Sequence, residues 1–256
     1  MPMDPSTAPA AGASVPVTPT ADGSRPLRLF CFPYAGGSAR LFAGWEAAMP
    51  AHVRLHAVEP AGRGSRFREP PHDRIEALIQ DLLPTLLAAR DAPYALFGYS
   101  LGALVAFELA RTMEQRFGCP PAHLCVGAFR APHMRRTAVP DYNLPEEQFR
   151  ERLRAFNGTP DAVLADDSLM ELVIPILRAD LAVADTYQHT AGRPLSCPIT
   201  AFAGTGDEEV PVSAVAQWER HTSAAFTLKV LEGDHFFIHQ QETTMLEHLS
   251  GVFEHG

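Results

Sequence analysis

Short hydrophobic runs alternate along the chain with longer segments in which apolar residues recur every three or four positions. Six runs predict buried strands, at Leu27–Phe32, Val53–Val58, Tyr94–Phe97, His123–Phe129, Ile199–Ala203 and Phe226–Leu231. Helical spacing occupies three of the intervening segments, at Ile75–Arg90, Leu101–Phe117 and Val212–His221. Strand and helix in regular alternation predict an α/β fold, a mostly parallel sheet with helices on both faces.

One long stretch interrupts this alternation. Between Pro132 and about Thr190 the sequence is helical and polar, and it contains no strand candidate. An insertion of this length between two core strands is far longer than an ordinary connection. Parallel sheets bind ligands at the carboxyl ends of their strands, so we interpret residues 132–190 as a helical lid over those ends. A packing subdomain is the alternative.

The amino-terminal segment differs in composition from the rest. Residues 1–25 are rich in Pro, Ala, Ser and Thr, and they lack the basic start and apolar stretch of a secretory signal. We expect a disordered tail there, followed by one domain over residues 26–256 with the lid insertion at about 132–190. No apolar run approaches the roughly 20 residues that span a bilayer. These features predict a cytoplasmic protein without membrane contact.

Composition and charge limit the classes of partner that the protein is expected to bind. Hydrophobic residues make up 46% of the chain and charged residues 20%, as in ordinary globular proteins, and the formal net charge is −9 without a basic block. We expect no nucleic-acid partner, because phosphate-backbone binding needs clustered Lys and Arg. The four cysteines are scattered along the chain without a C-x-x-C pair: Cys31, Cys119, Cys125 and Cys197. This spacing predicts reduced thiols, with no zinc site and no disulfide. We expect no metal and no cofactor.

A candidate nucleophile stands between the third strand and the helix that follows it. The sequence Gly98-Tyr99-Ser100-Leu101-Gly102 matches G-x-S-x-G in the strand–turn–helix setting where that pattern has chemical meaning. A sharp turn exposes the hydroxyl above the sheet, and the flanking glycines remove Cβ atoms that would clash. The helix amino terminus favours developing negative charge. Ser100 is therefore predicted to be the nucleophile; a structural tight turn is the alternative.

A serine hydroxyl needs a base to accept its proton. Among 11 histidines, His235 follows the last strand directly, in the run Glu232–Phe237. Gly233 and Asp234 predict a turn there, and the two phenylalanines that follow can shield the imidazole from water. We interpret His235 as the general base. His239, in the next predicted helix, is the weaker candidate, and a surface histidine is the alternative.

The base needs a carboxylate that holds its tautomer and stabilises the imidazolium. Asp207 ends the Gly-rich run that follows the fifth strand, so it lies at the same sheet edge as the serine and the histidine. The chain order Ser, Asp, His is the one expected for the α/β-hydrolase fold. Asp207 is the predicted acid, with Glu208, Glu209 and Asp234 as rivals.

Backbone N–H groups should hold the negative oxygen of the tetrahedral intermediate. The residue after the nucleophile, Leu101, supplies one donor, and the loop after the first strand supplies the other. That loop, Phe32–Ser38, contains paired glycines that let the backbone approach a substrate. We predict an oxyanion hole made by the N–H groups of Ala35 and Leu101; a flexible glycine turn is the alternative for the loop.

These motifs, taken together over about residues 27–250, resemble those of the type II thioesterases of polyketide and nonribosomal peptide synthases. The matching runs are Phe32-Pro33-Tyr34-Ala35-Gly36-Gly37, Pro60-Ala61-Gly62-Arg63-Gly64, Phe97-Gly98-Tyr99-Ser100-Leu101-Gly102, Arg130-Ala131-Pro132, Leu177-Arg178-Ala179-Asp180 and Gly233-Asp234-His235-Phe236-Phe237. The sequence departs from the family in having Tyr99 where His is often found, Leu101 where Met is frequent, and the extra Ala61.

The resemblance implies the α/β-hydrolase fold and a substrate: acyl groups held as thioesters on the phosphopantetheine of an acyl carrier or peptidyl carrier protein. It implies an editing role, the removal of stalled or aberrant acyl groups, with the cofactor carried by the partner. We expect a monomer. Carrier proteins tend to be acidic, so docking would use a basic patch, for which the candidates near the strand ends are Arg63, Arg66, Arg68, Arg130, Arg135 and Arg136.

Three other functions fit parts of this sequence. A carboxylesterase or lipase-like hydrolase of small esters shares the whole triad and differs only in its leaving group. A non-catalytic binding protein would keep the fold and use the space under the lid to bind a ligand. An acyltransferase would have to exclude water from the intermediate.

Overall fold

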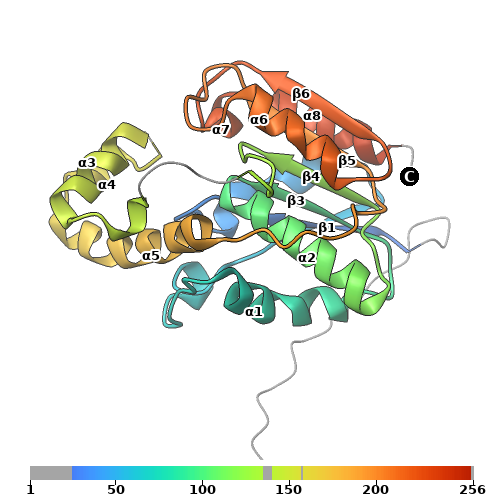
Figure 1. Cartoon of the computed structure of the whole chain (residues 1–256), viewed down its shortest axis with the longest axis horizontal. Helices are drawn as coiled ribbons and strands as arrows, with labels where there is room; N and C mark the ends of the chain where they lie inside the picture. Colours follow the sequence, from blue (N-terminus) through green and yellow to red (C-terminus); the bar gives the residue numbers. More distant parts are fainter. Residues whose placement is uncertain (1–24, 135–139, 157, 255–256) are drawn as a thin grey trace, which may run out of the picture.

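Six parallel strands form one sheet at the centre of the molecule (Figure 1). The computed structural model describes residues 25–134, 140–156 and 158–254. The strands are β1 (Leu27–Phe32), β2 (Val53–Ala57), β3 (Tyr94–Tyr99), β4 (His123–Gly127), β5 (Ile199–Gly204) and β6 (Phe226–Leu231). Their order is β2-β1-β3-β4-β5-β6, and every neighbouring pair is parallel. All six predicted strands are confirmed.

Strands β2 and β5 end within one residue of the prediction, and two other strand ends differ from it by two residues. Strand β3 continues two residues further, to Tyr99, and leads directly into the candidate nucleophile. Strand β4 ends at Gly127, two residues before the predicted Phe129. The next residue, Ala128, has a φ of 49°, a left-handed conformation that a strand cannot contain. The hydrophobic run thus continues beyond the strand.

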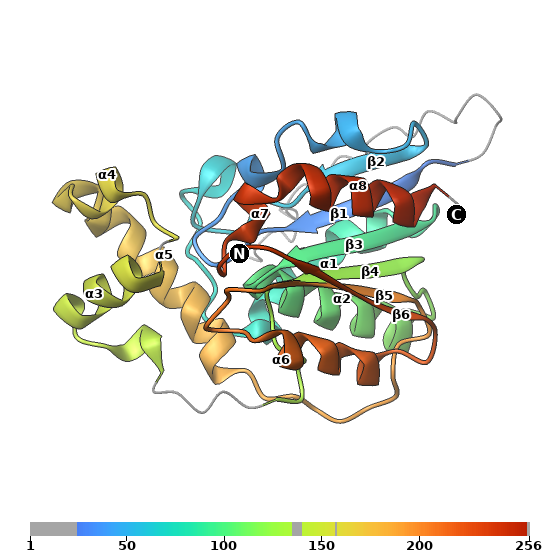
Figure 2. The same cartoon turned by 90° about the horizontal axis from the view of Figure 1, so that it is seen from above.

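Helices cover both faces of the sheet, as predicted (Figure 2). One face carries α1 (Ile75–Ala88), α2 (Leu101–Phe117) and α6 (Val212–Ala216), and the other carries α8 (Glu242–Phe253). Helix α2 has the predicted bounds, and α1 ends two residues early. The predicted helix Val212–His221 divides into α6 and a 3₁₀ segment, Gln217–His221. Short 3₁₀ segments also occupy Ala39–Phe42, Trp45–Ala48 and Gly64–Arg66.

The core has two halves, one on each side of the sheet. Alternate side chains of β1 point to opposite faces, so Phe30 and Phe32 pack with α1 and α2. Leu29 and Cys31 pack on the other side with α8. Both faces of the strand are covered, which explains why four consecutive positions of β1, Leu29 to Phe32, are hydrophobic.

A group of helices projects beyond the carboxyl ends of the strands, between β4 and β5 (Figure 1). It consists of a 3₁₀ turn (Asp141–Asn143), α3 (Glu146–Phe156), α4 (Asp161–Leu164) and α5 (Asp167–Thr186). We call residues 141–186 the insertion. Its helices share a small core of their own: Phe149, Leu153, Leu164, Met170, Ile174 and Leu177. This placement matches the position predicted for a lid.

Three further predictions concern the ends of the chain, membranes and cysteines. The predicted tail, residues 1–25, lies outside the described residues except for Arg25. No helix in the described part of the chain is long and apolar enough to cross a membrane. The four cysteines are free thiols, and three of them are buried.

Candidate active site

Ser100 occupies a strained turn between β3 and α2. Its φ of 53° and ψ of −121° lie in a region that residues with a side chain rarely adopt. The turn is held in place because the N–H of Ser100 donates to the carbonyl of Gly127 on β4 at 2.8 Å. The predicted exposure of the hydroxyl at the start of a helix follows from this geometry.

The two flanking glycines allow the turn to pack against its neighbours. A Cβ on Gly98 would lie 2.0 Å from the carbonyl oxygen of Gly102. A Cβ on Gly102 would lie 2.1 Å from the carbonyl oxygen of Phe32 in β1. Both obstructing atoms belong to the backbone, so neither clash can be relieved by a change of rotamer.

Gly98→Ala is expected to lower the free energy of unfolding by about 3 kcal/mol or more, because strand and helix must separate to admit the methyl group. Gly251→Ala in α8 is the matched control, since a Cβ there meets nothing within 4 Å. The control should be neutral or stabilising by up to about 1 kcal/mol. Urea unfolding of the three proteins tests this, and equal midpoints would contradict the packing argument.

His235 and Asp207 complete a hydrogen-bonded relay with Ser100. The Oγ atom of Ser100 lies 2.9 Å from Nε2 of His235. On the other side of the ring, Nδ1 of His235 lies 2.8 Å from Oδ2 of Asp207. The structure thus brings together three side chains that the sequence places on loops after β3, β5 and β6. The arrangement has the donor and acceptor order required for removing a proton from the serine.

The carboxylate of Asp207 has a fixed orientation. Its side chain is fully buried, and Oδ1 accepts hydrogen bonds from the N–H groups of Glu209 and Val210 at 3.0 and 2.9 Å. Oδ2 is therefore directed at the imidazole, whose Nδ1 must carry the proton to donate to it. This tautomer leaves Nε2 as the acceptor for the serine proton.

The rival residues have other positions. Glu208 and Glu209 are exposed, and Glu209 pairs with Arg152 of α3 at 2.8 Å. Asp234 accepts a hydrogen bond from the N–H of Phe236. His239 lies in the short helix α7 (Phe237–Gln240) and bonds to a tyrosine hydroxyl at 3.0 Å.

Tyr99 has a positioning role that the sequence analysis missed. Its hydroxyl donates to the carbonyl oxygen of His235 at 2.8 Å and accepts from the N–H of Ile238 at 3.3 Å. Burial raises the pKa of this hydroxyl well above its ordinary value, so it remains a donor. The tyrosine thus ties the histidine loop to β3. Tyr99 stands where the family often has His, and this departure was the sequence signal that could have indicated the role.

Only one of the two predicted phenylalanines shields the imidazole. The ring of Phe236 lies edge-on to that of His235, with centroids 5.2 Å apart. Phe237 is fully buried and packs against Tyr99 instead. The second ring near the imidazole belongs to Phe156 of the insertion, at 6.4 Å.

The two predicted oxyanion donors lie beside the nucleophile. Ala35 lines the same cavity as Ser100, and Leu101 is the first residue of α2. Among the described residues, neither N–H donates a hydrogen bond to another group of the protein. Both donors are therefore available to an oxygen bound above the serine.

A cavity of about 70 Å³ lies directly over the relay. Its walls come from the core and from the insertion: Tyr34, Ala35, Ser100, Leu153, Phe156, Gly158, Thr159, Leu177, Leu181, His235 and Phe236. The insertion closes tightly over the histidine loop, because a Cβ on Gly158 would lie 2.1 Å from the ring of Phe236. Most of these side chains are apolar, so the site suits an acyl chain better than a charged group.

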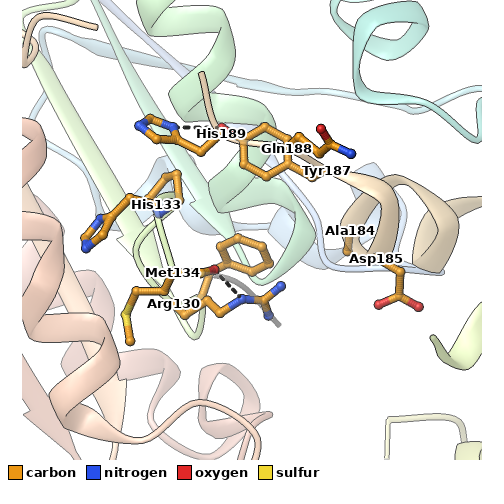
Figure 3. Close-up of a pocket in the computed structure, with 10 residues that line it drawn as sticks. Arg130, His133, Met134, Ala184, Asp185, Tyr187, Gln188 and His189 are labelled. Carbon is orange, nitrogen blue, oxygen red and sulfur yellow. Dashed lines mark hydrogen bonds between the residues drawn. The ribbon is translucent and has the colours of Figure 1, made fainter. Parts of the chain in front are cut away.

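A second cavity, of about 470 Å³, lies between residues 129–134 and 184–189 (Figure 3). It contains none of the three relay residues, and its larger volume does not make it the site of the chemistry. Figure 3 shows Arg130 and His133 on one side and Tyr187 and His189 on the other. The Nε of Arg130 donates to the carbonyl of Met134 at 3.2 Å.

Three histidines meet at this second cavity, and two of them, His133 and His189, line it. Nδ1 of His133 lies 2.8 Å from Nε2 of His221, and the rings of His189 and His221 are edge-on at 5.2 Å. Burial, together with the smaller effects of the neighbouring histidines, Arg111 and Arg220, lowers the pKa of His221 to about 3. The pKa values of His133 and His189 are lowered by burial as well. The folded protein thus holds all three rings neutral near pH 7.

Acid is therefore expected to destabilise the fold. The unfolded chain binds a proton at His221 near pH 6.5, whereas the folded chain binds it only near pH 3. Stability is full above about pH 6.5 and falls as the pH decreases toward 3, by about 1.4 kcal/mol per pH unit for this group. At pH 5 the loss from His221 should be about 2 kcal/mol. Urea unfolding at several pH values should show a shallower slope for His221→Gln; an unchanged slope would contradict the assignment.

No group of three or more His, Cys, Asp or Glu side chains that could hold a metal ion occurs in the part of the chain that the structure describes. The expectation that the chain itself needs no metal or cofactor remains a prediction. The chemistry available at the site is that of the relay and the backbone donors.

The predicted basic patch needs a correction at Arg63. This side chain is buried and forms a two-pronged ion pair with Asp180 of α5, so it does not face a partner. Arg66 is paired with Glu69 and Asp81. Arg68 is exposed. Residues 135 and 136, the last two candidates, lie outside the described residues.

Comparison with known proteins gives a consistent family. The thioesterase domain family matches residues 27–253. Thioesterase PikA5 of Streptomyces venezuelae is 39% identical over 219 residues, which cover 84% of this chain and 76% of the relative.

Two solved structures are similar over almost the whole chain. The RedJ thioesterase from the prodiginine biosynthetic pathway in Streptomyces coelicolor has a TM-score of 0.83 and 36% identity, covering 95% of this chain and 96% of that one. YbtT, a type II thioesterase from the yersiniabactin NRPS/PKS biosynthetic pathway, has a TM-score of 0.81 and 30% identity, covering 94% and 98%. The predicted α/β-hydrolase fold and the predicted resemblance to type II thioesterases are confirmed.

Proposed function

Because the chain belongs to the thioesterase domain family, we propose that it hydrolyses acyl thioesters on the phosphopantetheine arm of acyl carrier or peptidyl carrier proteins. Its role would be editing, the removal of aberrant acyl groups during polyketide or nonribosomal peptide biosynthesis. The predicted enzyme class, a hydrolase that acts on thioesters, follows from the family. The observation that carries the proposal is the Ser100–His235–Asp207 relay, of which Ser100 and His235 line a mostly apolar cavity.

The first half of the reaction forms an acyl-enzyme. Ser100 Oγ attacks the thioester carbonyl while Nε2 of His235 accepts the hydroxyl proton. The carbonyl oxygen becomes negative and accepts hydrogen bonds from the N–H groups of Ala35 and Leu101. Asp207 stabilises the imidazolium. When the carbon–sulfur bond breaks, His235 returns the proton to the departing thiol, and the acyl group remains esterified to the serine.

The second half releases the acid. A water molecule takes the place of the thiol and gives a proton to His235 as its oxygen attacks the ester carbonyl. The same backbone donors hold the second oxyanion. Collapse of this intermediate returns the proton to Ser100 and frees the carboxylic acid. The chain itself supplies every group in this scheme, and the phosphopantetheine belongs to the partner.

Intact-mass measurement after rapid mixing with acylated carriers tests the proposal. A mass gain equal to the acyl group, located on Ser100 by peptide mapping, is the expected result. A series of acyl lengths in the same experiment shows which chain accumulates and is released. No acyl adduct and no acid release from any carrier would reject the proposal.

Parallel assays separate the other hydrolases. We expect faster turnover of acyl thioesters than of oxygen esters with the same acyl group, and the opposite order would favour a carboxylesterase or lipase-like enzyme. A fluorophosphonate should label Ser100, and failure to label would favour a non-catalytic binding protein. Transfer of the acyl group to an added alcohol, which gives an ester in place of the free acid, would favour an acyltransferase.

The partner surface is part of the proposal. We infer that carrier proteins dock near the strand ends through exposed basic side chains such as Arg68. Raising salt should slow turnover of carrier-bound substrate more than turnover of a small free thioester, because exposed charges are screened. Equal effects would count against docking by charge. We further expect a monomer that acts in the cytoplasm, where the free thiols stay reduced.

A further inference from the structure

A buried ion pair connects the insertion to the candidate oxyanion loop. Asp180 of α5 is 3% exposed and Arg63, in the loop after β2, is 8% exposed. Both guanidinium Nη atoms of Arg63 donate to the carboxylate of Asp180, with Nη2 at 2.8 Å from Oδ1. The same carboxylate accepts the backbone N–H of Gly36, at 2.7 Å from Oδ2. We call this Arg63–Asp180–Gly36 arrangement the clamp.

Burial of the two charged groups of the clamp costs free energy. Removing a carboxylate and a guanidinium from water costs several kcal/mol each, which their attraction only partly offsets. Nε of Arg63 is also buried without a hydrogen-bond partner, the single such side-chain atom found among the described residues. Two apolar side chains of similar volume would stabilise the contact at least as much as the ion pair does. The cost of burying the charged pair therefore indicates a role beyond stability.

The geometry of the loop indicates that role. Residues 34–37 form a turn, closed by a hydrogen bond of 2.8 Å from the N–H of Gly37 to the carbonyl of Tyr34. Gly36 has a φ of 77°, as required at the third position of a type II turn. Its N–H is taken by Asp180 and that of Gly37 by Tyr34. Of residues 35, 36 and 37, Ala35 is therefore the one whose N–H no described protein group accepts, which leaves it for an oxyanion.

A second contact from the same helix face presses on the turn. Leu177 lies one helical turn before Asp180, and a Cβ on Gly36 would lie 2.5 Å from its Cδ2 atom. The turn thus fits directly against α5, with a charged contact on one side and an apolar contact on the other. Any shift of α5 would move the peptide plane that precedes Gly36.

We propose that Asp180, oriented by Arg63, is a positioning residue that fixes the Ala35 N–H in the oxyanion hole, so that docking of α5 on the core completes the hole. The inference rests on the proposed function, because it requires an oxyanion to form above Ser100. It accounts for the Leu177–Asp180 motif, which the triad chemistry does not use. It also gives the insertion a task in catalysis besides covering the chamber.

Two double variants test the clamp, with a small free acyl thioester as substrate so that carrier docking plays no part. Arg63→Met with Asp180→Leu, which we call the apolar pair, removes both charges and the acceptor for the N–H of Gly36. Arg63→Gln with Asp180→Asn, which we call the amide pair, removes the charges and keeps an amide oxygen in the acceptor position. The apolar pair should lower kcat by about 10- to 100-fold with KM within about 3-fold, because displacing one donor weakens only the transition state. The amide pair should stay within about 5-fold of the parent.

A transition-state analogue supplies an independent readout. Ser100 adds to an acyl trifluoromethyl ketone, and the resulting alkoxide occupies the oxyanion hole. Its Kd should rise in the apolar pair by the factor by which kcat/KM falls, whereas the Kd of the matching methyl ketone should not change. A purely structural clamp would change both affinities together.

Controls separate misfolding from mispositioning. Arg28→Met with Asp91→Leu removes another pair with a buried guanidinium, 3.3 Å apart at the end of the sheet opposite the turn, and should leave kcat within about 2-fold. Thermal unfolding confirms that each variant is folded. If the apolar pair does not fold, Asp180→Glu keeps the charge and displaces the carboxylate by one methylene, and it should lower kcat in the same selective way.

The outcomes are distinct. A parent enzyme that hydrolyses neither the small thioester nor any acylated carrier rejects the proposed function, and the clamp with it. With an active parent, a folded apolar pair that retains parental kcat overturns the clamp. Equal losses in the apolar and amide pairs also overturn it, because they would assign the effect to charge and not to the acceptor for Gly36.

Discussion

Ser100→Ala is expected to lower kcat for thioester hydrolysis by at least about 10³-fold while leaving the fold intact. Alanine removes the Oγ atom that lies 2.9 Å from Nε2 of His235, and no other hydroxyl replaces it in the relay. The backbone donors of Ala35 and Leu101 remain, so a small residual rate above that in water is expected. Steady-state kinetics with a small free thioester measure the loss, and intact mass should show no acyl adduct.

Two comparisons make this result specific. His235→Ala should cost a similar factor, and the double variant should be little worse than either single one, because the two groups act as one unit. Ser65→Ala, at an exposed serine in the 3₁₀ segment Gly64–Arg66, should remain within about 2-fold of the parent. A Ser100→Ala protein with close to parental activity would show that the hydrolysis proceeds by another route.

Much of this site could be predicted because its signals are local. The G-x-S-x-G pattern needs a strand before it and a helix after it, and both were readable from hydrophobic periodicity around Ser100. Parallel strands end at one edge of the sheet, so residues that follow β5 and β6 had to approach the residue that follows β3. The observed distances in the relay confirm that Asp207 and His235 meet there.

Two of the errors in the predicted elements have a common cause. At Ala128 and at Gln217 the hydrophobic pattern continues while the backbone conformation changes. Periodicity records which side chains are buried, and burial does not depend on whether a segment is strand, α-helix or 3₁₀. Trp218 is fully buried within the 3₁₀ segment, which kept the helical spacing in the sequence.

The clamp could not be predicted from local pattern. Arg63 and Asp180 are 117 residues apart, and each lies in a segment whose composition is that of an exposed loop or an amphipathic helix. Only their pairing makes burial of either charge tolerable, and pairing is not encoded in periodicity. The Leu177–Asp180 motif drew attention to the right place through resemblance alone. The same argument applies to Tyr99, whose partners are backbone atoms on a distant loop.

Asp207→Asn is expected to lower kcat by about 10³- to 10⁴-fold, through the tautomer of the histidine. The N–H groups of Glu209 and Val210 both point at Oδ1, so the amide oxygen of an asparagine must take that position. The NH₂ group then faces Nδ1 of His235, which must accept a hydrogen bond and give up its proton. The proton moves to Nε2, and the ring can no longer accept one from the serine.

This prediction separates orientation from charge and from folding. The substitution is nearly isosteric and keeps all hydrogen bonds of the buried side chain, so the midpoint of urea unfolding should change little near neutral pH and KM should stay within about 3-fold. Glu208→Gln, the same chemical change at the exposed neighbour, should leave kcat within about 2-fold. Kinetics on a small free thioester at pH 7.5 compare the three proteins. Parental activity in Asp207→Asn, or a comparable loss in Glu208→Gln, would assign the acid to another residue, because the loop holds the Asp207 side chain in one orientation only.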